Sequence, residues 1–254
     1  MSAPSRDLRR FAPLLAAFCL LLGGCVYLRL LELKRQLADF DHYFKVDETN
    51  GLTFTMQEPV LLVDDMAFFE LAPESTEQLG AAIRWHLRWI KDYAAPGEHA
   101  TDYEVEADFT FVDGKMVRLH LPERTFSFVQ KSFVLQALRS LGHASVDKSS
   151  RSARTTLDAS RLAPLTHTDL LHFLGAPLET RRDGDHLLLH YVYRDVCASP
   201  TPGKIDFTFT LDAVTQSVVH LEGKLFHVEV QFDWPVTQPK EKAAEQPLRS
   251  RPTG

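Results

Sequence analysis

The chain has 254 residues, of which 44% are hydrophobic and 24% are charged, and its formal net charge is −6 at pH 7. This length and apolar content provide for one large or two small domains with hydrophobic cores. The mildly acidic balance excludes nucleic acid as an expected partner, because nucleic-acid binding depends on dense Lys and Arg side chains.

The N-terminal segment has the three-part order of a bacterial export signal. Arg6, Arg9 and Arg10 form a basic start, residues 11–22 are almost wholly apolar, and two glycines follow. A transmembrane helix needs roughly 20 apolar residues, so this run is short for a membrane span. The segment therefore predicts export across a membrane.

Leu22-Gly23-Gly24-Cys25 also resembles the lipobox of bacterial lipoproteins. The resemblance implies that residues 1–24 are a signal peptide, and that the Cys25 thiol carries a diacylglycerol after cleavage. Cleavage removes three arginines and one aspartate, which changes the net charge from −6 to −8. Because Val26 rather than an aspartate follows the cysteine, the resemblance implies the periplasmic face of the outer membrane. Two other interpretations remain: an uncleaved signal anchor, and an ordinary signal whose cysteine is incidental.

The three cysteines predict no intrachain disulfide. Cys19 lies in the signal and Cys25 would carry the lipid, which leaves Cys197 alone. A lone thiol is more often a small buried apolar group than a nucleophile.

The first predicted element of the mature chain is a helix over residues 26–44. Its apolar residues recur at spacings of four and three; they are Val26, Leu30, Leu33, Leu37, Phe40 and Phe44. We expect this stripe to pack on the helix's own domain, and the alternative is that the helix lies against the bilayer or a partner.

Strand signals dominate the next hundred residues. We expect strands at residues 52–56, 84–89 and 103–111, and a short helix at 59–71. Asp113-Gly114 predicts a hairpin turn into a strand at 116–121. In the strand at 84–89 the polar side chains Arg84, His86 and Arg88 share one face, which is a candidate contact surface.

The remaining elements follow in similar order. The sequence predicts helices at 131–141 and 168–174, with an exposed linker at 144–156 between them. Strands are expected at 187–194, 205–211, 217–221 and 225–232, and a disordered tail from Pro235.

Several features recur in the same order in both halves of the chain. Pro73 and Pro177, like His86 and His190, are 104 residues apart, and Asp108 and Asp206 begin identical Asp-Phe-Thr-Phe tetrapeptides; His120 and His220 are 100 apart. These matches predict an internal duplication. The alternative is that strands resemble one another in sequence because they share the same alternation of apolar and polar residues.

The predicted fold class is therefore α+β, with two related repeats that each pack one or two helices on an antiparallel sheet. The repeats would span residues 25–130 and 131–234, followed by the tail at 235–254.

Leu174-Gly175-Ala176-Pro177 and the strand ending Tyr191-Val192-Tyr193 resemble the SmpA/OmlA-like lipoproteins of the outer-membrane assembly machine. The resemblance implies two helices on a three-stranded antiparallel sheet, and the β-lactamase inhibitor proteins are similar as tandem copies of such a unit. What it implies is a binding or scaffolding module. It assigns no partner-binding residue of that family to this chain.

The sequence contains no phosphate-binding glycine loop, His-Glu-x-x-His, Cys-x-x-Cys or Gly-x-Ser-x-Gly motif, so we expect no catalytic residue and no cofactor. His186 and His190 would lie about 13 Å apart along one strand, which is too far for one zinc ion. Asp64-Asp65 is expected to cap a helix rather than to act as a paired-carboxylate catalyst, and we expect no metal site.

The sequence as a whole predicts a non-enzymatic lipoprotein that acts in protein binding or envelope assembly. Its partners would be the membrane, through the lipid on Cys25, and an envelope protein. The candidate contact elements are the helix at 26–44 and the polar sheet faces. The alternative is a periplasmic carrier or sensor of a small apolar ligand, which a cavity between sheet and helices would favour.

Overall fold

The computed structural model describes residues 26–94, 103–127, 130–147, 152–156, 165–197, 203–225 and 228–234. The predicted signal peptide, Cys25 and the predicted disordered tail lie outside these ranges.

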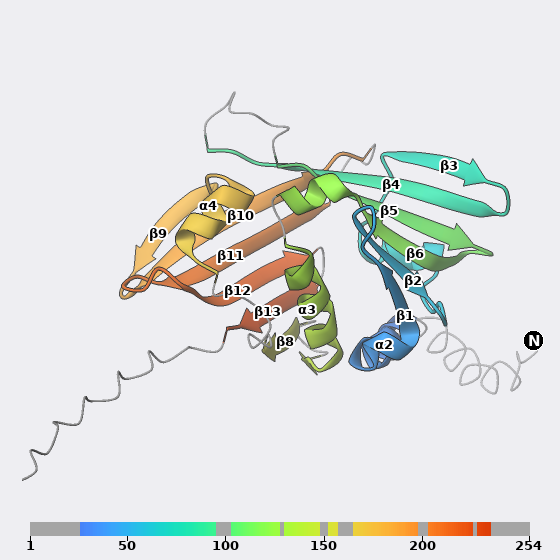
Figure 1. Cartoon of the computed structure of the whole chain (residues 1–254), viewed down its shortest axis with the longest axis horizontal. Coiled ribbons are helices and arrows are strands. Elements are labelled where there is room, and N and C mark those ends of the chain that lie inside the picture. The colour runs from blue at the N-terminus through green and yellow to red at the C-terminus, as the bar shows by residue number, and fades with distance from the viewer. Residues whose placement is uncertain are drawn as a thin grey trace, which may run out of the picture.

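The described strands form one 13-stranded sheet (Figure 1). Its strands are β1 Phe44–Asp47, β2 Leu52–Met56, β3 Ser75–Leu79, β4 Ala82–Lys91, β5 Val105–Val112, β6 Lys115–Leu121, β7 Ser145–Asp147, β8 Ser152–Thr156, β9 Glu179–Asp183, β10 His186–Asp195, β11 Lys204–Asp212, β12 Val218–Leu225 and β13 Val228–Asp233. The order is β1-β2-β6-β5-β4-β10-β11-β12-β13-β8-β7, with β3 added to β4 and β9 added to β10. Every pair is antiparallel except β13 with β8.

The predicted fold class is wrong, because the two halves do not form separate helix-on-sheet units. β3 pairs only with residues 82–86 of β4, and β9 only with 186–190 of β10. The last residues of β4 and β10 therefore keep unpaired backbone groups, which must be satisfied by hydrogen bonds. They pair with each other and so join both halves into one sheet. The parallel pair also makes the sheet mixed rather than antiparallel.

The junction between β4 and β10 is symmetric in register. Ile90 pairs with Arg194 at its centre, and on either side Lys91 pairs with Tyr193 and Trp89 with Asp195. Each residue of β4 thus occupies the position of the β10 residue 104 places later. The same difference of 104 relates the β3–β4 pairs to the β9–β10 pairs.

The helices are few and short. They are a helix over residues 26–38, α2 Phe40–Tyr43, the 3₁₀ turns η1 Val63–Ala67 and η2 Glu123–Ser127, α3 Lys131–Gly142 and α4 His167–Leu174. α4 begins with a capping box, in which Thr166 Oγ1 accepts a hydrogen bond from the Asp169 amide and the Asp169 carboxylate accepts one from the Thr166 amide. This exchange satisfies two backbone donors and fixes the helix start.

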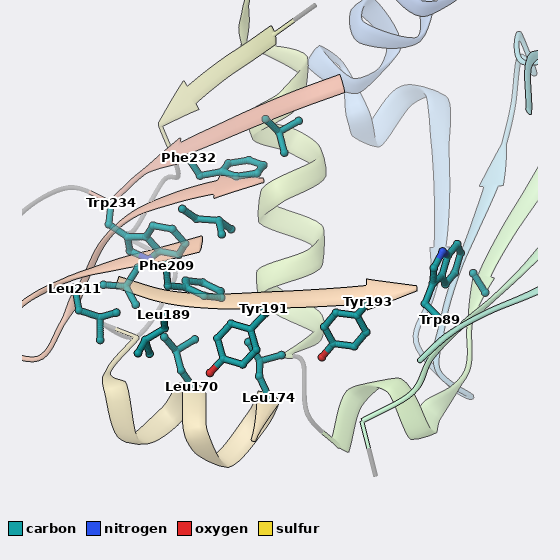
Figure 2. Packing of buried hydrophobic residues seen from close by; sticks show 14 of the residues in the cluster. Trp89, Leu170, Leu174, Leu189, Tyr191, Tyr193, Phe209, Leu211, Phe232 and Trp234 are labelled. Atoms are coloured by element: carbon teal, nitrogen blue, oxygen red, sulfur yellow. The ribbon is translucent and has the colours of Figure 1, made fainter. Parts of the chain in front are cut away.

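The helices and the sheet enclose two apolar clusters. Figure 2 shows the first, which centres on Leu189, Tyr191 and Phe209 and is covered by Leu170 and Leu174 of α4. The second centres on Leu52, Phe54 and Met66 beside β1, β2 and η1. α3 packs against both, so it lies between the two halves of the core.

The N-terminal helix packs on its own domain, as predicted. Leu30, Leu33 and Leu37 contact the second cluster, to which Phe40 and Phe44 also belong. The prediction of one continuous helix to residue 44 is wrong in two details. The helix is interrupted at Asp39, after which α2 follows, and Phe44 begins β1 by pairing with Met56.

Two further predictions need correction. Residues 144–156, expected as an exposed linker, contribute β7 and β8, and the buried Thr155 hydroxyl donates to the Ser140 carbonyl of α3 at 2.8 Å. The helix expected at 59–71 is only the short turn η1, in which the Asp65 carboxylate accepts from the Leu62 amide at 2.8 Å.

Candidate functional site

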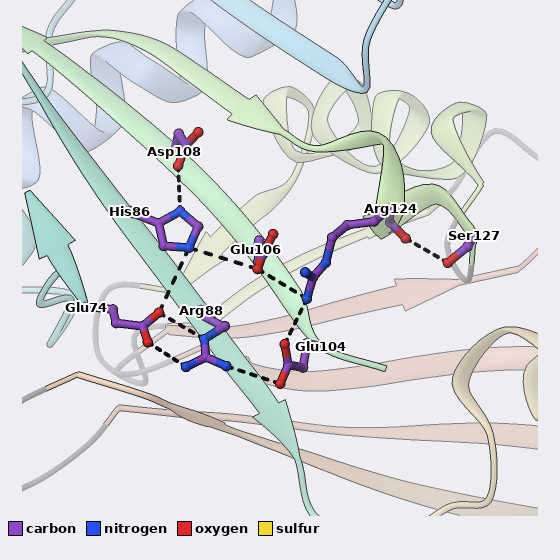
Figure 3. A network of polar contacts seen from close by, with 8 residues as sticks. All are labelled: Glu74, His86, Arg88, Glu104, Glu106, Asp108, Arg124 and Ser127. Carbon is purple, nitrogen blue, oxygen red and sulfur yellow. Dashed lines mark hydrogen bonds and ion pairs between the residues drawn. The ribbon is translucent and has the colours of Figure 1, made fainter. Parts of the chain in front are cut away.

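The face of the sheet opposite the apolar clusters is polar. Alternation directs the even-numbered residues of β4 and β5 to this face, because successive side chains of a strand point to opposite sides. The predicted contact residues Arg84, His86 and Arg88 all lie there, on β4. The structure therefore places the three on one strand, and Figure 3 shows the acidic groups that surround His86 and Arg88.

Arg88 is the centre of this polar network. Its guanidinium forms a two-pronged contact with Glu74, from Nε at 2.9 Å and from Nη2 at 2.5 Å, and Nη1 donates to Glu104 at 3.2 Å. The hydrogen bond from Arg88 lowers the pKa of Glu74, and the same pairing raises the pKa of Arg88. Both groups are therefore charged at neutral pH.

Glu104 is the most deeply buried acid of the network, with 6% of its side chain exposed. It also accepts a hydrogen bond from Arg124 of η2 at 2.8 Å, and Arg124 lies 3.2 Å from Glu106. A buried carboxylate is costly unless it is paired. The two arginines therefore hold Glu104 and connect the end of β4 to η2.

His86 lies at the other end of the network. Its Nδ1 is 2.8 Å from the Asp108 carboxylate, and its Nε2 lies 3.9 Å from Glu74 and 4.0 Å from Glu106. Four carboxylates thus surround two guanidinium groups and one imidazole, so the patch carries surplus negative charge. We name Glu74, His86, Arg88, Glu104, Glu106, Asp108 and Arg124 the acidic network.

Arg84 stands beside the acidic network and is paired with Glu77 of β3 at 3.0 Å. All three predicted residues are thus engaged by acids. The sequence predicted a polar contact surface that includes these three residues, and the structure shows that each of them is paired with carboxylates.

Sequence reasoning missed the partners for different reasons. Glu104, Glu106 and Asp108 alternate with apolar residues, so the sequence showed that they share one face. It did not show that this face lies beside His86 and Arg88 of β4. Glu74 and Arg124 lie outside any periodic pattern, and only the fold brings Glu74 to Arg88 and Arg124 to Glu104.

The second half carries a simpler version of this face. His190, at the position of His86, contacts Asp206 at 2.6 Å, and Lys204 contacts the same carboxylate at 2.7 Å. Burial raises the pKa of Asp206, but the hydrogen bonds from Lys204 and His190 together outweigh it, so the pKa of this carboxyl is lowered. Val192, buried, occupies the position of Arg88. The network around Arg88 therefore belongs to the first half alone.

Within the described ranges, no group of three or more His, Cys, Asp or Glu side chains is placed to hold a metal ion. The same ranges contain no helix that is both long and apolar enough to cross a membrane. No protein-family model, no curated protein and no solved structure matches the chain.

Proposed function

We propose that this protein is a non-enzymatic lipoprotein of the bacterial envelope, anchored through Cys25, and that it binds another envelope protein on the polar face of its sheet. The observation that carries the proposal is the arrangement of the sheet, whose helices pack on one face while the acidic network and the His190–Asp206 pair lie on the other. The anchor itself is inferred from the lipobox-like sequence.

The interior supports binding by a surface rather than binding of a ligand inside. Leu87, Leu189 and Leu211 are fully buried between the sheet and the helices, and aromatic side chains stack around them. The alternative apolar ligand would have to bind among these buried side chains. The surplus carboxylates of the polar face favour a partner with basic side chains, since complementary charge guides recognition.

The test is site-specific photo-crosslinking in living cells. A photoreactive amino acid replaces Arg84 on the polar face, where the side chain is 39% exposed. In a control it replaces Leu171 on α4, an exposed residue away from that face. We expect one discrete adduct from position 84, none from position 171, and loss of the adduct when Cys25→Ala removes the anchor. Adducts of equal yield from both positions, or from neither, would contradict the proposal.

A further inference from the structure

The helix over residues 26–38 is fixed against the domain on its inner side. Besides its packed leucines, Arg29 forms an ion pair with Asp65 of η1, and its Nε donates to Asp65 Oδ2 at 2.7 Å. The Asp65 side chain is only 3% exposed. Because both the apolar contacts and this buried pair set the rotation of the helix, the direction of its outer side is set as well.

That outer side is apolar over the first two turns. Tyr27 is 41% exposed, Leu28 65% and Leu31 40%. Positions three and four apart share a helix face, so the three side chains form one surface. Phe68 adjoins it, with its ring 5.7 Å from that of Tyr27 in an edge-to-face contact. We name these four residues the N-terminal apolar patch.

The patch lies next to the point where the chain would meet the membrane. Leu28 is three residues after Cys25, and three residues span at most about 11 Å even when fully extended. The apolar run at 11–22 comes shortly before. Whether Cys25 carries a lipid or the apolar run is retained, the chain leaves the bilayer beside the patch.

The character of the helix surface changes further along. Arg35 donates to Glu32 from Nε at 2.8 Å, so an exposed ion pair follows the apolar turns. The exposed apolar side chains near the anchor are of the kind that bury at the boundary between headgroups and acyl chains, and the charged pair further along marks where this apolar surface ends. Tyr27 suits a location at that boundary, since tyrosine and tryptophan are enriched at membrane interfaces.

We infer that the N-terminal apolar patch contacts the lipid bilayer and holds the domain directly against the membrane surface, without a flexible spacer. The inference rests on the proposed anchoring and adds a defined orientation to it. The ligand is the acyl and glycerol region of the lipids. A protein covering the patch is the competing occupant, and the experiment separates the two.

The experiment uses the full chain with Cys19→Ser and Cys197→Ser, purified from membranes and reconstituted in vesicles of phosphatidylethanolamine and phosphatidylglycerol. An environment-sensitive fluorophore is attached at Leu28→Cys. The control fluorophore is attached at Val214→Cys, which replaces another exposed apolar residue, 87% exposed. Val214 lies in the turn between β11 and β12, which Figure 1 shows at the left end of the sheet, away from α2.

Lipids that carry a nitroxide on their acyl chains should quench the fluorophore at position 28, because its side chain would lie near the acyl boundary, and leave that at position 214 unchanged. The inference is overturned if the probe at position 28 is not quenched although the protein sediments with the vesicles and its mass shows a lipid on Cys25. That result leaves the anchoring intact and assigns the patch to a protein. Protein that neither sediments nor carries the lipid overturns the proposed anchoring, and the inference with it.

Discussion

Two charged side chains lie inside the molecule at the junction of β4 and β10. Lys91 is 2% exposed and Asp195 is 5% exposed, and the register places them at corresponding positions of the two halves. The Lys91 ammonium donates to the carbonyls of Leu174 and Ala176, both at 2.5 Å. Burial raises the pKa of the Asp195 carboxyl, and the nearby polar groups of Val196 and Cys197 oppose this only in part.

The raised pKa of Asp195 predicts that Asp195→Asn stabilises the protein at neutral pH. A folded-state pKa above the unfolded value of 3.8 means that the ionised carboxylate opposes folding. This carboxyl therefore favours the folded state below pH 3.8, and that contribution is lost as the pH rises through the folded pKa. We expect the variant to have a higher free energy of unfolding than wild type at pH 7, and an equal one at about pH 3.5.

The control for this experiment is Asp212→Asn, for which we expect the opposite change in the free energy of unfolding at pH 7. The backbone and hydroxyl of Thr215 lower the pKa of Asp212, so its ionised form favours folding at pH 7 and the variant should lose stability there. Denaturant unfolding at the two pH values measures both. A loss of stability at pH 7 in Asp195→Asn would show that the carboxylate is satisfied in the folded protein.

At the scale of elements, the sequence predicted the strands that have one buried face. β2 matches residues 52–56, and β4, β5, β10 and β11 differ from their predicted bounds only at the ends, because their apolar and polar residues alternate. β3 and β9 were not predicted. All five residues of each are exposed, so neither strand has the periodic burial from which such a prediction is made.

The contacts of the acidic network were also only partly predictable from the sequence. The alternating acids of β5 revealed a polar face, but the contact of Arg88 with Glu74 joins residues 14 apart through the β3–β4 pairing. Since β3 was not predicted, that contact was not predictable either.

The contact of Lys91 with the end of α4 predicts that this lysine stabilises the helix. Carbonyls at a helix C-terminus lack intrahelical donors, and a cation there also interacts favourably with the helix dipole. Lys91→Met keeps the side-chain length and removes the donors, so we expect the local stability of α4 to fall by about 1–3 kcal/mol.

Hydrogen exchange of the α4 amides measures this change. Lys224→Met, which alters an exposed lysine of β12, should leave α4 as protected as in wild type. Equal protection of α4 in Lys91→Met would show that the two carbonyls do not depend on the ammonium.

At the scale of the whole molecule, the registers of the two halves correspond more closely than the sequence matches suggested. Trp85 pairs with Phe109 as Leu189 pairs with Phe209, which sets a difference of 100 for β5 and β11. The Asp-Phe-Thr-Phe tetrapeptides differ by 98, so Asp206 lies at the position of Glu106, not of Asp108. The two tetrapeptides are therefore displaced by two residues from structurally equivalent positions. A shift of two residues keeps each side chain on the same face of its strand, so the sequence pattern alone does not reveal the misalignment.

The match of His120 with His220 is displaced in the same way. Phe109 pairs with Leu119, and Phe209 with Leu221, so β6 and β12 differ by 102 residues, and His220 lies at the position of Arg118. Both strand pairs shift register directly after the threonine at position 110 or 210. The duplication stays a prediction about the history of the chain, while the common register is a property of its fold.

Because α3 packs on both apolar clusters, we expect the two halves to unfold together. Phe133 and Ala137 pack on the first cluster, where Phe133 stacks on Trp234 with ring centroids 6.0 Å apart, and Leu135 and Leu138 pack on the second. One helix thus contributes to both clusters, and the β4–β10 pairing joins them through the sheet. Loss of either contact surface should therefore weaken the whole fold.

We expect Phe133→Ala and Leu138→Ala each to lower the free energy of unfolding by about 2 kcal/mol. Hydrogen exchange of β2 in the second cluster and of β11 in the first reports the two halves separately. In a single cooperative unit, each variant lowers the protection of both strands by the same amount, because their slowest amides exchange only through global unfolding. If Phe133→Ala weakens β11 alone and Leu138→Ala weakens β2 alone, the halves unfold independently, and the continuous sheet does not couple them.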